Sequence, residues 1–230
     1  MKVGSHTSRL LAALTVGVIA LALTEAAASG AGKGGPGKET IHLTAAGQAA
    51  ARAAVLTQPD LGTAPGWTGG PKKPVLASTL PCRYQPKQSD LVVVGAAESD
   101  WQNAALRFDS EAQVLQTPEM VRLDWERTVL APQVVPCLRT ALSKQLGASG
   151  RLASFRRIAF PAVATYARAY RVVVDVKAST ATVPVMVDMV LVGRGSTEIT
   201  LTTSAPLANQ PVVSAAEIRL AKLLLSRTRA

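Results

Sequence analysis

Apolar and polar residues alternate most regularly between residues 104 and 116. Leu106, Phe108, Ala112 and Val114 fall on one side of an extended chain, and the polar residues between them fall on the other. A period of two over this length predicts a half-buried strand of an antiparallel sheet. Valine-rich or alternating segments predict further strands at about 91–98, 152–160, 164–176, 182–192 and 196–204. The region from Pro59 to Pro71 is expected to be irregular, with one short strand at most.

The last two of these strands flank a Gly-Arg-Gly turn at 193–195, so they are expected to form a hairpin. In the closing strand, Ile199 and Leu201 are expected to face the core, and Glu198 is expected to face water. Trp101 is expected to lie in the turn between two strands.

Apolar residues recur at helical spacing in four other segments. These predict helices at about 44–55, 117–129, 132–147 and 210–226. The Thr-Pro-Glu sequence at 117–119 suits a helix start, because threonine caps, proline fits the first turn, and glutamate meets the positive end of the helix dipole. Antiparallel strands with helices outside them predict an α+β fold, with a sheet of about five to seven strands.

The first residues predict export. Lys2 and Arg9 precede an apolar run at 10–23, and Ala26 to Ala28 offer a cleavage site, so residues 1–28 are interpreted as a signal peptide. An uncleaved N-terminal anchor is the alternative. Residues 29–43 are glycine-rich and predict a flexible linker, and 44–230 are expected to be one extracellular domain. No segment of the mature chain is expected to span a membrane. The mature protein is therefore placed outside the cell or on the outer side of the envelope.

The net charge of +10 favours anionic partners. The basic residues are spread along the chain without the aromatic interleaving of single-strand binders, so no nucleic-acid partner is expected. In an exported protein, the expected electrostatic partners are anionic polymers or lipids of the cell envelope.

The chain has two cysteines, Cys82 and Cys137. In an oxidising compartment they predict a disulfide bond, and closing a loop of this length stabilises a fold by roughly 4 kcal/mol on the chain-entropy model. A metal site is the weaker reading, because two thiols without a nearby histidine make half of a ligand set.

Catalytic chemistry has little support in the sequence. After removal of the signal peptide the only histidine is His42, and no nucleotide-binding or zinc motif is present. No catalytic residue, cofactor or metal is therefore predicted, and the protein is not expected to be an enzyme. A hydrolase would need two facing carboxylates, for which Asp175 and Asp188 on neighbouring strands are the candidates.

Three residues are candidates for ligand or partner binding. Arg122 and Trp125 lie three apart on one predicted helix, and a guanidinium beside an indole can hold an anionic or aromatic ligand. Trp101 is the third, as part of an exposed rim. The alternative for Trp125 is simple packing against the sheet.

The order of these features resembles a known family. A leading helix and a loop cysteine are followed by strands, the Thr-Pro-Glu start, Trp125, Cys137, a strand hairpin and an amphipathic C-terminal helix. The chain thereby resembles the extracellular sensor-type domains of actinobacterial receptor kinases and related exported lipoproteins, with a PsbP-like α/β/α sandwich. It departs from them in having one cysteine pair and no kinase.

The resemblance implies a secreted, non-catalytic, sensor-like module that binds a small ligand, a lipid or an envelope protein. The alternative is a basic structural or assembly factor on anionic wall polymers or the membrane surface.

Overall fold

The structure is a computed structural model, and it describes residues 38–76, 83–147, 150–177 and 181–228. The predicted signal peptide and Cys82 lie outside these ranges. Among the helices in the described ranges, none combines the length and the apolar character needed to cross a membrane.

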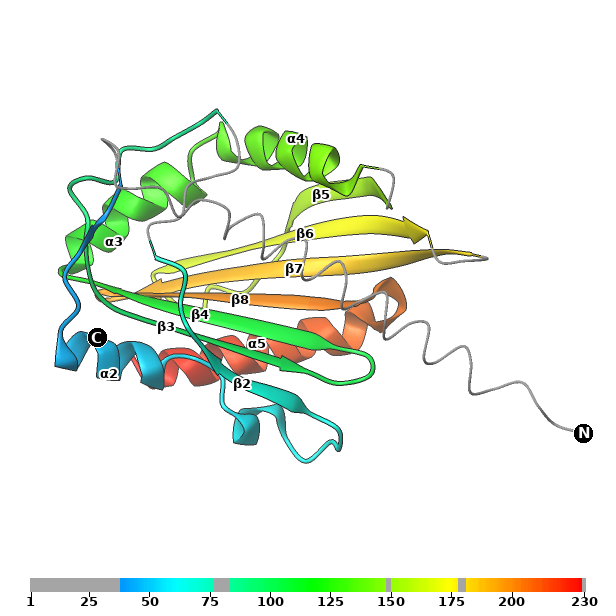
Figure 1. The fold of residues 1–230 in the computed structure, drawn as a ribbon, viewed down its shortest axis with the longest axis horizontal. Coiled ribbons are helices and arrows are strands. Elements are labelled where there is room, and N and C mark those ends of the chain that lie inside the picture. Colours follow the sequence, from blue (N-terminus) through cyan, green and yellow to red (C-terminus); the bar gives the residue numbers. More distant parts are fainter. Residues whose placement is uncertain (1–37, 77–82, 148–149, 178–180, 229–230) are drawn as a thin grey trace, which may run out of the picture.

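A mostly antiparallel sheet forms the centre of the fold (Figure 1). Its strands run in the order β1-β3-β4-β8-β7-β6-β5, and β2 also pairs with β3. Only β1 is parallel to its neighbour among the pairs in the described chain. The eight strands are β1 (Thr40–Ile41), β2 (Thr68–Lys72), β3 (Val92–Gln102), β4 (Arg107–Leu115), β5 (Gly150–Ile158), β6 (Tyr166–Lys177), β7 (Thr182–Arg194) and β8 (Thr197–Pro206).

These strands confirm the predicted α+β class and the hairpin of β7 and β8, whose turn contains Gly195 with a positive φ of 56°. Two strands were not placed by the prediction, although it allowed for one short strand in the irregular region that holds β2. β1 lies within residues 29–43, so the prediction of a flexible linker is wrong for Thr40 and Ile41. β2 lies in the glycine-rich segment, where Gly69 approaches β3 so closely that an added Cβ would stand 2.0 Å from the Asp100 carbonyl oxygen.

Four helices pack on the sheet, close to their predicted positions. Thr44 and Thr117 cap two of them, since their hydroxyls accept hydrogen bonds from the amides of Gly47 and Met120. A π-helical turn, Trp125–Val129, continues the second helix. The helices are α2 (Ala45–Ala53), α3 (Pro118–Asp124), α4 (Val134–Leu146) and α5 (Gln210–Ser226).

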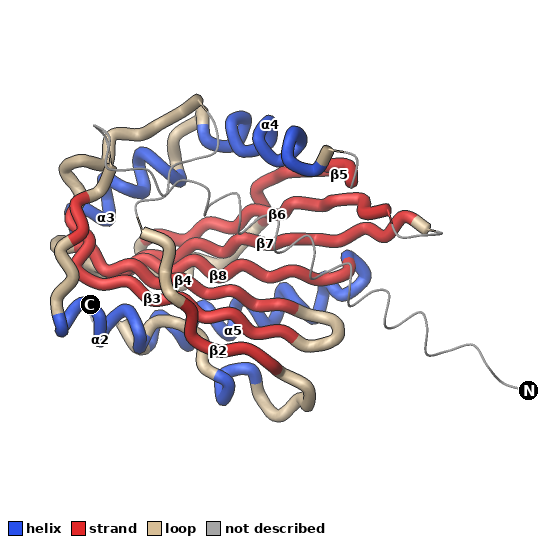
Figure 2. The backbone as a smooth tube through the Cα atoms, viewed as in Figure 1, coloured by secondary structure: helices blue, strands red, loops and turns tan. Residues whose placement is uncertain are grey.

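The helices cover both faces of the sheet, which gives three layers (Figure 2). On one face, α2 and α5 pack on Ile199 and Leu201 of β8. On the other face, α3 packs on β3, and α4 packs on Phe155 of β5. Each strand in the middle of the sheet therefore has a layer on either side. This matters for the site, because polar residues of an alternating strand can be buried under the second layer.

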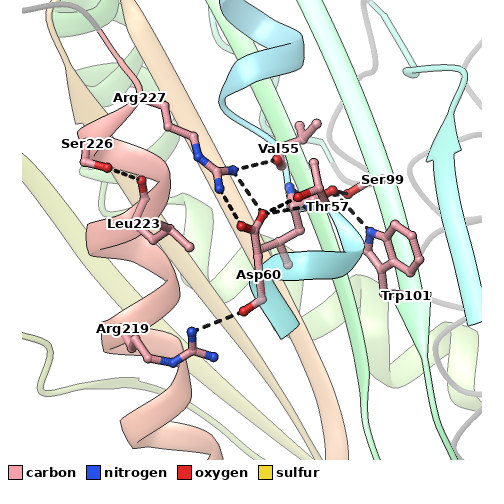
Figure 3. A network of polar contacts seen from close by, with 11 residues as sticks. Val55, Thr57, Asp60, Ser99, Trp101, Arg219, Leu223, Ser226 and Arg227 are labelled. Atoms are coloured by element: carbon pink, nitrogen blue, oxygen red, sulfur yellow. Dashed lines mark hydrogen bonds and ion pairs between the residues drawn. The ribbon is translucent and has the colours of Figure 1, made fainter. Parts of the chain in front are cut away.

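The short helical turn after α2, Gln58–Leu61, is tied to the end of α5 by Asp60 (Figure 3). The Asp60 carboxylate accepts hydrogen bonds from the Arg227 guanidinium and from the Thr57 amide, the latter at 2.8 Å. Arg219 of α5 donates to the Asp60 backbone carbonyl at 3.1 Å. Burial alone would raise the pKa of Asp60, but these hydrogen bonds outweigh it and leave the pKa below its ordinary value.

Candidate functional site

Trp101 does not belong to an exposed rim. It lies in β3, only 8% of it is exposed, and its indole Nε1 donates to the carbonyl of Leu56 at 3.1 Å (Figure 3). The prediction of an exposed Trp101 between strands is wrong, because β3 continues four residues beyond its predicted end. Its hydrogen bond and burial give it a structural role.

Arg122 and Trp125 do not face a common site. Arg122 is exposed and binds the carboxylates of Glu119 and Glu126 on the outer side of the helix. Trp125 is 3% exposed and stacks on Tyr166 with ring centroids 5.2 Å apart. Gly193 leaves room for this indole, since a Cβ there would stand 3.1 Å from Nε1. Trp125 therefore packs against the sheet, which was the alternative interpretation of this residue.

The predicted disulfide stays a prediction. Cys137 lies in α4 and is not a free thiol, and Cys82 lies outside the described residues. α4 covers the core around Phe155, so a bridge at Cys137 would fasten the loop before β3 to this helical layer.

Asp175 and Asp188 do not form a carboxylate pair. Asp188 is fully buried and binds Arg171, which lies directly opposite it on β6. Asp175 binds the exposed guanidinium of Arg151 from β5. Each carboxylate is thus held by its own arginine, which leaves neither one placed to activate water or attack a substrate together with the other.

A groove lies where β5 ends and β6 begins. Its volume is about 440 Å³, within the range of small-molecule sites. The loop between β5 and β6 is bound by Arg194, which donates to the Val163 carbonyl at 3.5 Å. The lining residues are Arg157, Ile158, Ala159, Phe160, Ala167, Arg168 and Ala169.

The groove runs along the edge of the sheet, where β5 ends, and its apolar and basic residues lie on opposite faces, because Arg157 pairs with Tyr170 while Ile158 pairs with Ala169. Ile158, Phe160 and Ala169 belong to, or pack against, the core under α5. Arg157 is exposed and Arg168 is half-buried, and neither forms an ion pair with an acidic residue in the described ranges. Arg168 reaches only the carbonyl of Ala167, at 3.4 Å. Such a lining suits a ligand with an anionic group and an apolar part.

The surroundings of the groove are basic. Residues 131–187 contain eight lysines and arginines and one acidic residue, Asp175. Five of the basic residues are exposed on α4 and β5: Arg139, Lys144, Arg151, Arg156 and Arg157. The positive charge is therefore concentrated on the α4 and β5 side of the molecule, and this side can attract polyanions as well as a small anion.

Acidic residues gather at the opposite end of the sheet. The ligand oxygens of Glu98, Asp109 and Glu111 lie within 4.8 Å of one another, as a divalent cation site requires. Lys72 of β2 already supplies a cation there, since its Nζ stands 3.7 Å from Glu98 and 3.5 Å from Asp109. Burial raises the pKa of Asp109 to about 6, and the Glu98 carboxylate adds to this rise.

Under α3 lies a second carboxyl cluster, made of Glu39, Asp124 and Glu198. The prediction that Glu198 faces water is wrong: its carboxyl is buried against Asp124 and Trp125. Burial raises the pKa of all three groups, and that of Glu39 reaches about 7 with a further contribution from Asp124. Alternation alone placed Glu198 on the polar side of β8 correctly, but it could not show that α3 covers that side.

No family model and no curated protein sequence matches the chain. Among solved structures, it is similar to the extracellular domain of PknH from Mycobacterium tuberculosis, with 11% sequence identity and a TM-score of 0.40. The alignment covers 78% of this chain and 95% of that domain.

Proposed function

We propose that this protein is a non-catalytic, sensor-like binding module that works on the outer side of the membrane and takes an anionic, partly apolar ligand. One observation carries the proposal: the groove at the start of β6 is lined by apolar residues and by two arginines without acidic partners in the described chain. An anionic headgroup would pair with the guanidinium groups of Arg157 and Arg168, and an alkyl or aromatic part would pass along the edge of the sheet to Ile158 and Phe160. A lipid with a phosphate headgroup has this chemistry.

Dodecyl phosphate below its micelle concentration is a suitable probe, measured by isothermal titration calorimetry. Inorganic phosphate tests the headgroup alone, and dodecyl maltoside tests the alkyl chain alone. We expect the anionic amphiphile to bind more tightly than either comparator. Charge-assisted hydrogen bonds are worth ~1.5–3 kcal/mol each, so Arg157→Gln with Arg168→Gln should weaken binding at least about tenfold.

The matched control is Arg156→Gln, the neighbouring exposed arginine of β5, which does not line the groove. Equal affinity in the wild type and the double variant, or equal binding of the neutral detergent, would refute the proposal.

A second function is favoured by the charge of residues 131–187. Association with an anionic wall polymer would use the whole basic side, so Arg156→Gln and Arg139→Gln would weaken it as much as changes in the groove. Such binding would also fall steeply between 50 and 500 mM salt, because exposed charges are screened beyond about 10 Å at 0.1 M ionic strength. Groove binding supported by apolar contact would depend less on salt.

A further inference from the structure

The first described strand is attached to the sheet by few contacts. β1 is two residues long, and three backbone amides in and beside it donate to β3 or to the residue before it. These bonds run from Thr40 to Leu91, from His42 to Val93 and from Thr44 to Val94, each at 2.9 Å. Both β1 residues are exposed. Such a short strand needs support from side chains, since little apolar surface is buried by it.

Glu39 supplies that support. It directly precedes β1, and its Oε2 accepts a hydrogen bond at 2.9 Å from Gln113, which belongs to β4 on the far side of β3. The Glu39 carboxyl also interacts electrostatically with Asp124 at the end of α3 and with Glu198 of β8, and Glu198 is hydrogen-bonded to Asp124. The residue before β1 and residues of α3, β4 and β8 therefore form one cluster.

The cation that acts on Asp124 is itself held by another carboxylate. Arg127 lowers the pKa of Asp124, but its guanidinium is bound to Asp90 at 2.7 and 3.0 Å. Asp124 also accepts hydrogen bonds from Gln88 at 3.3 Å and Thr128 at 3.2 Å. On the side of β1, Lys38 and His42 flank Glu39 in the chain, and on β4 the next carboxyl along the same face is Glu111.

One oxygen in the cluster has no partner. Glu198 Oε1 is buried without a hydrogen bond to any group in the described residues. Three carboxyl groups with this surrounding cannot all carry charge without strong repulsion and desolvation cost. They are compatible with the packed arrangement when they hold protons.

We propose that Glu39, Asp124 and Glu198 form a carboxyl latch, which keeps β1 on the sheet while these groups are protonated and frees it when they ionise. The inference is independent of the proposed ligand groove, because that groove lies at the opposite edge of the sheet, between β5 and β6. Release of β1 would uncover the outer edge of β3 beside Leu91 and Val93.

The direction and size of the effect follow from linkage. A carboxyl whose pKa is higher in the attached state favours attachment fully below its ordinary pKa, and this support is lost as pH rises toward the higher value. With a pKa of 4.5 when free and about 7 when attached, Glu39 alone raises the ratio of free to attached β1 about 70-fold between pH 5 and pH 8.

Hydrogen exchange of the amides of Thr40, His42 and Thr44, corrected for intrinsic rates at each pH, measures this ratio directly. In the wild type we expect protection to fall by roughly the calculated 70-fold between pH 5 and pH 8. Glu39→Gln and Glu198→Gln keep the size of the side chains but cannot ionise, so each should reduce the fall. The matched control is Glu119→Gln, an exposed carboxyl on α3 that binds Arg122, and it should behave as the wild type.

Two results would overturn the latch. One is equal protection of these three amides at pH 5 and pH 8 in the wild type. The other is a parallel loss of protection in the central strands β6 and β7, which would report unfolding of the whole domain in place of release of β1. Should Glu198→Gln fail to fold, Glu39→Gln still decides the matter, because Glu39 lies outside the regular elements, directly before β1.

Discussion

Removing the charge of Asp188 should destabilise the fold more than any exposed charge change. Asp188 and Arg171 face each other on β7 and β6, and Arg171 Nε donates to Asp188 Oδ1 at 2.7 Å. Their side chains are 0% and 3% exposed. α5 closes over the pair, where Arg171 also donates to Ser214 at 3.2 Å. Asp188→Asn would leave the guanidinium buried without its counter-charge.

The expected cost is about 3–5 kcal/mol, the usual penalty for breaking a buried ion pair from one side. For a domain of this size, ~1 kcal/mol shifts Tm by ~2–4 °C, so the variant should melt ~6–20 °C lower. Glu217 of α5 can partly replace the lost negative charge beside Arg171. Burial and the nearby Asp188 raise its pKa to about 8, so loss of the Asp188 charge lets Glu217 ionise beside Arg171. The double variant Asp188→Asn with Glu217→Gln should therefore be less stable than the sum of the single changes.

Urea unfolding at pH 7, followed by circular dichroism, gives the free energies. The control is Asp175→Asn, which breaks the surface pair with Arg151, a side chain that is 76% exposed. This change should cost less than about 1 kcal/mol. If Asp188→Asn cost no more than the control, the view of the pair as a buried, mutually dependent unit would be wrong.

Three further outcomes are expected. Gly95→Ala should destabilise the domain by more than about 2 kcal/mol in urea, because its Cβ would stand 2.0 Å from the Gly47 carbonyl oxygen and push α2 off β3; an unchanged midpoint would show that the helix can shift freely. Wild-type stability should fall as pH rises from about 4.5 to 8, since Glu217 keeps its proton more firmly when folded, and Glu217→Gln should flatten that part of the curve. Intact mass under non-reducing conditions should show a deficit of about two daltons for a bridge between Cys82 and Cys137, and reduction should lower stability by roughly 4 kcal/mol; an unchanged mass on reduction would rule the bridge out.

The regular elements could be predicted because local pattern and tertiary packing agree in them. α5 begins and ends at the predicted residues, and Thr117 caps α3 as its Thr-Pro-Glu sequence indicates. The hairpin of β7 and β8 follows from two apolar strands around a glycine turn. β2 could not be found this way. Its sequence, Thr-Gly-Gly-Pro-Lys, has no strand pattern, and it becomes a strand only because β3 offers a free edge.

The candidate sites escaped prediction for a different reason. Alternation assigns the polar residues of a strand to one face, and that assignment holds for Glu198 and Asp109. The assumption that this face meets water fails, because other elements cover it. Glu198 is buried beside Asp124 of α3, and Asp109 is buried beside Glu98 and Lys72 of β2, so burial raises the pKa of both carboxyls.

The basic groove depends on topology in the same way. Arg157 and Arg168 are eleven residues apart, and nothing in their local sequence marks them as partners. The antiparallel pairing of β5 with β6 places Ile158 opposite Ala169 and so carries both arginines to one end of the sheet. β5 is also the last strand of the sheet, where charged residues commonly prevent edge-to-edge association. That role explains exposed arginines such as Arg156, but it does not require a half-buried guanidinium such as that of Arg168 on the next strand. Replacing Arg168 therefore best separates edge protection from ligand binding. If Arg168 protects the edge of the sheet, the variant should aggregate. If Arg168 binds the ligand, the variant should stay monomeric and lose affinity for the anionic amphiphile.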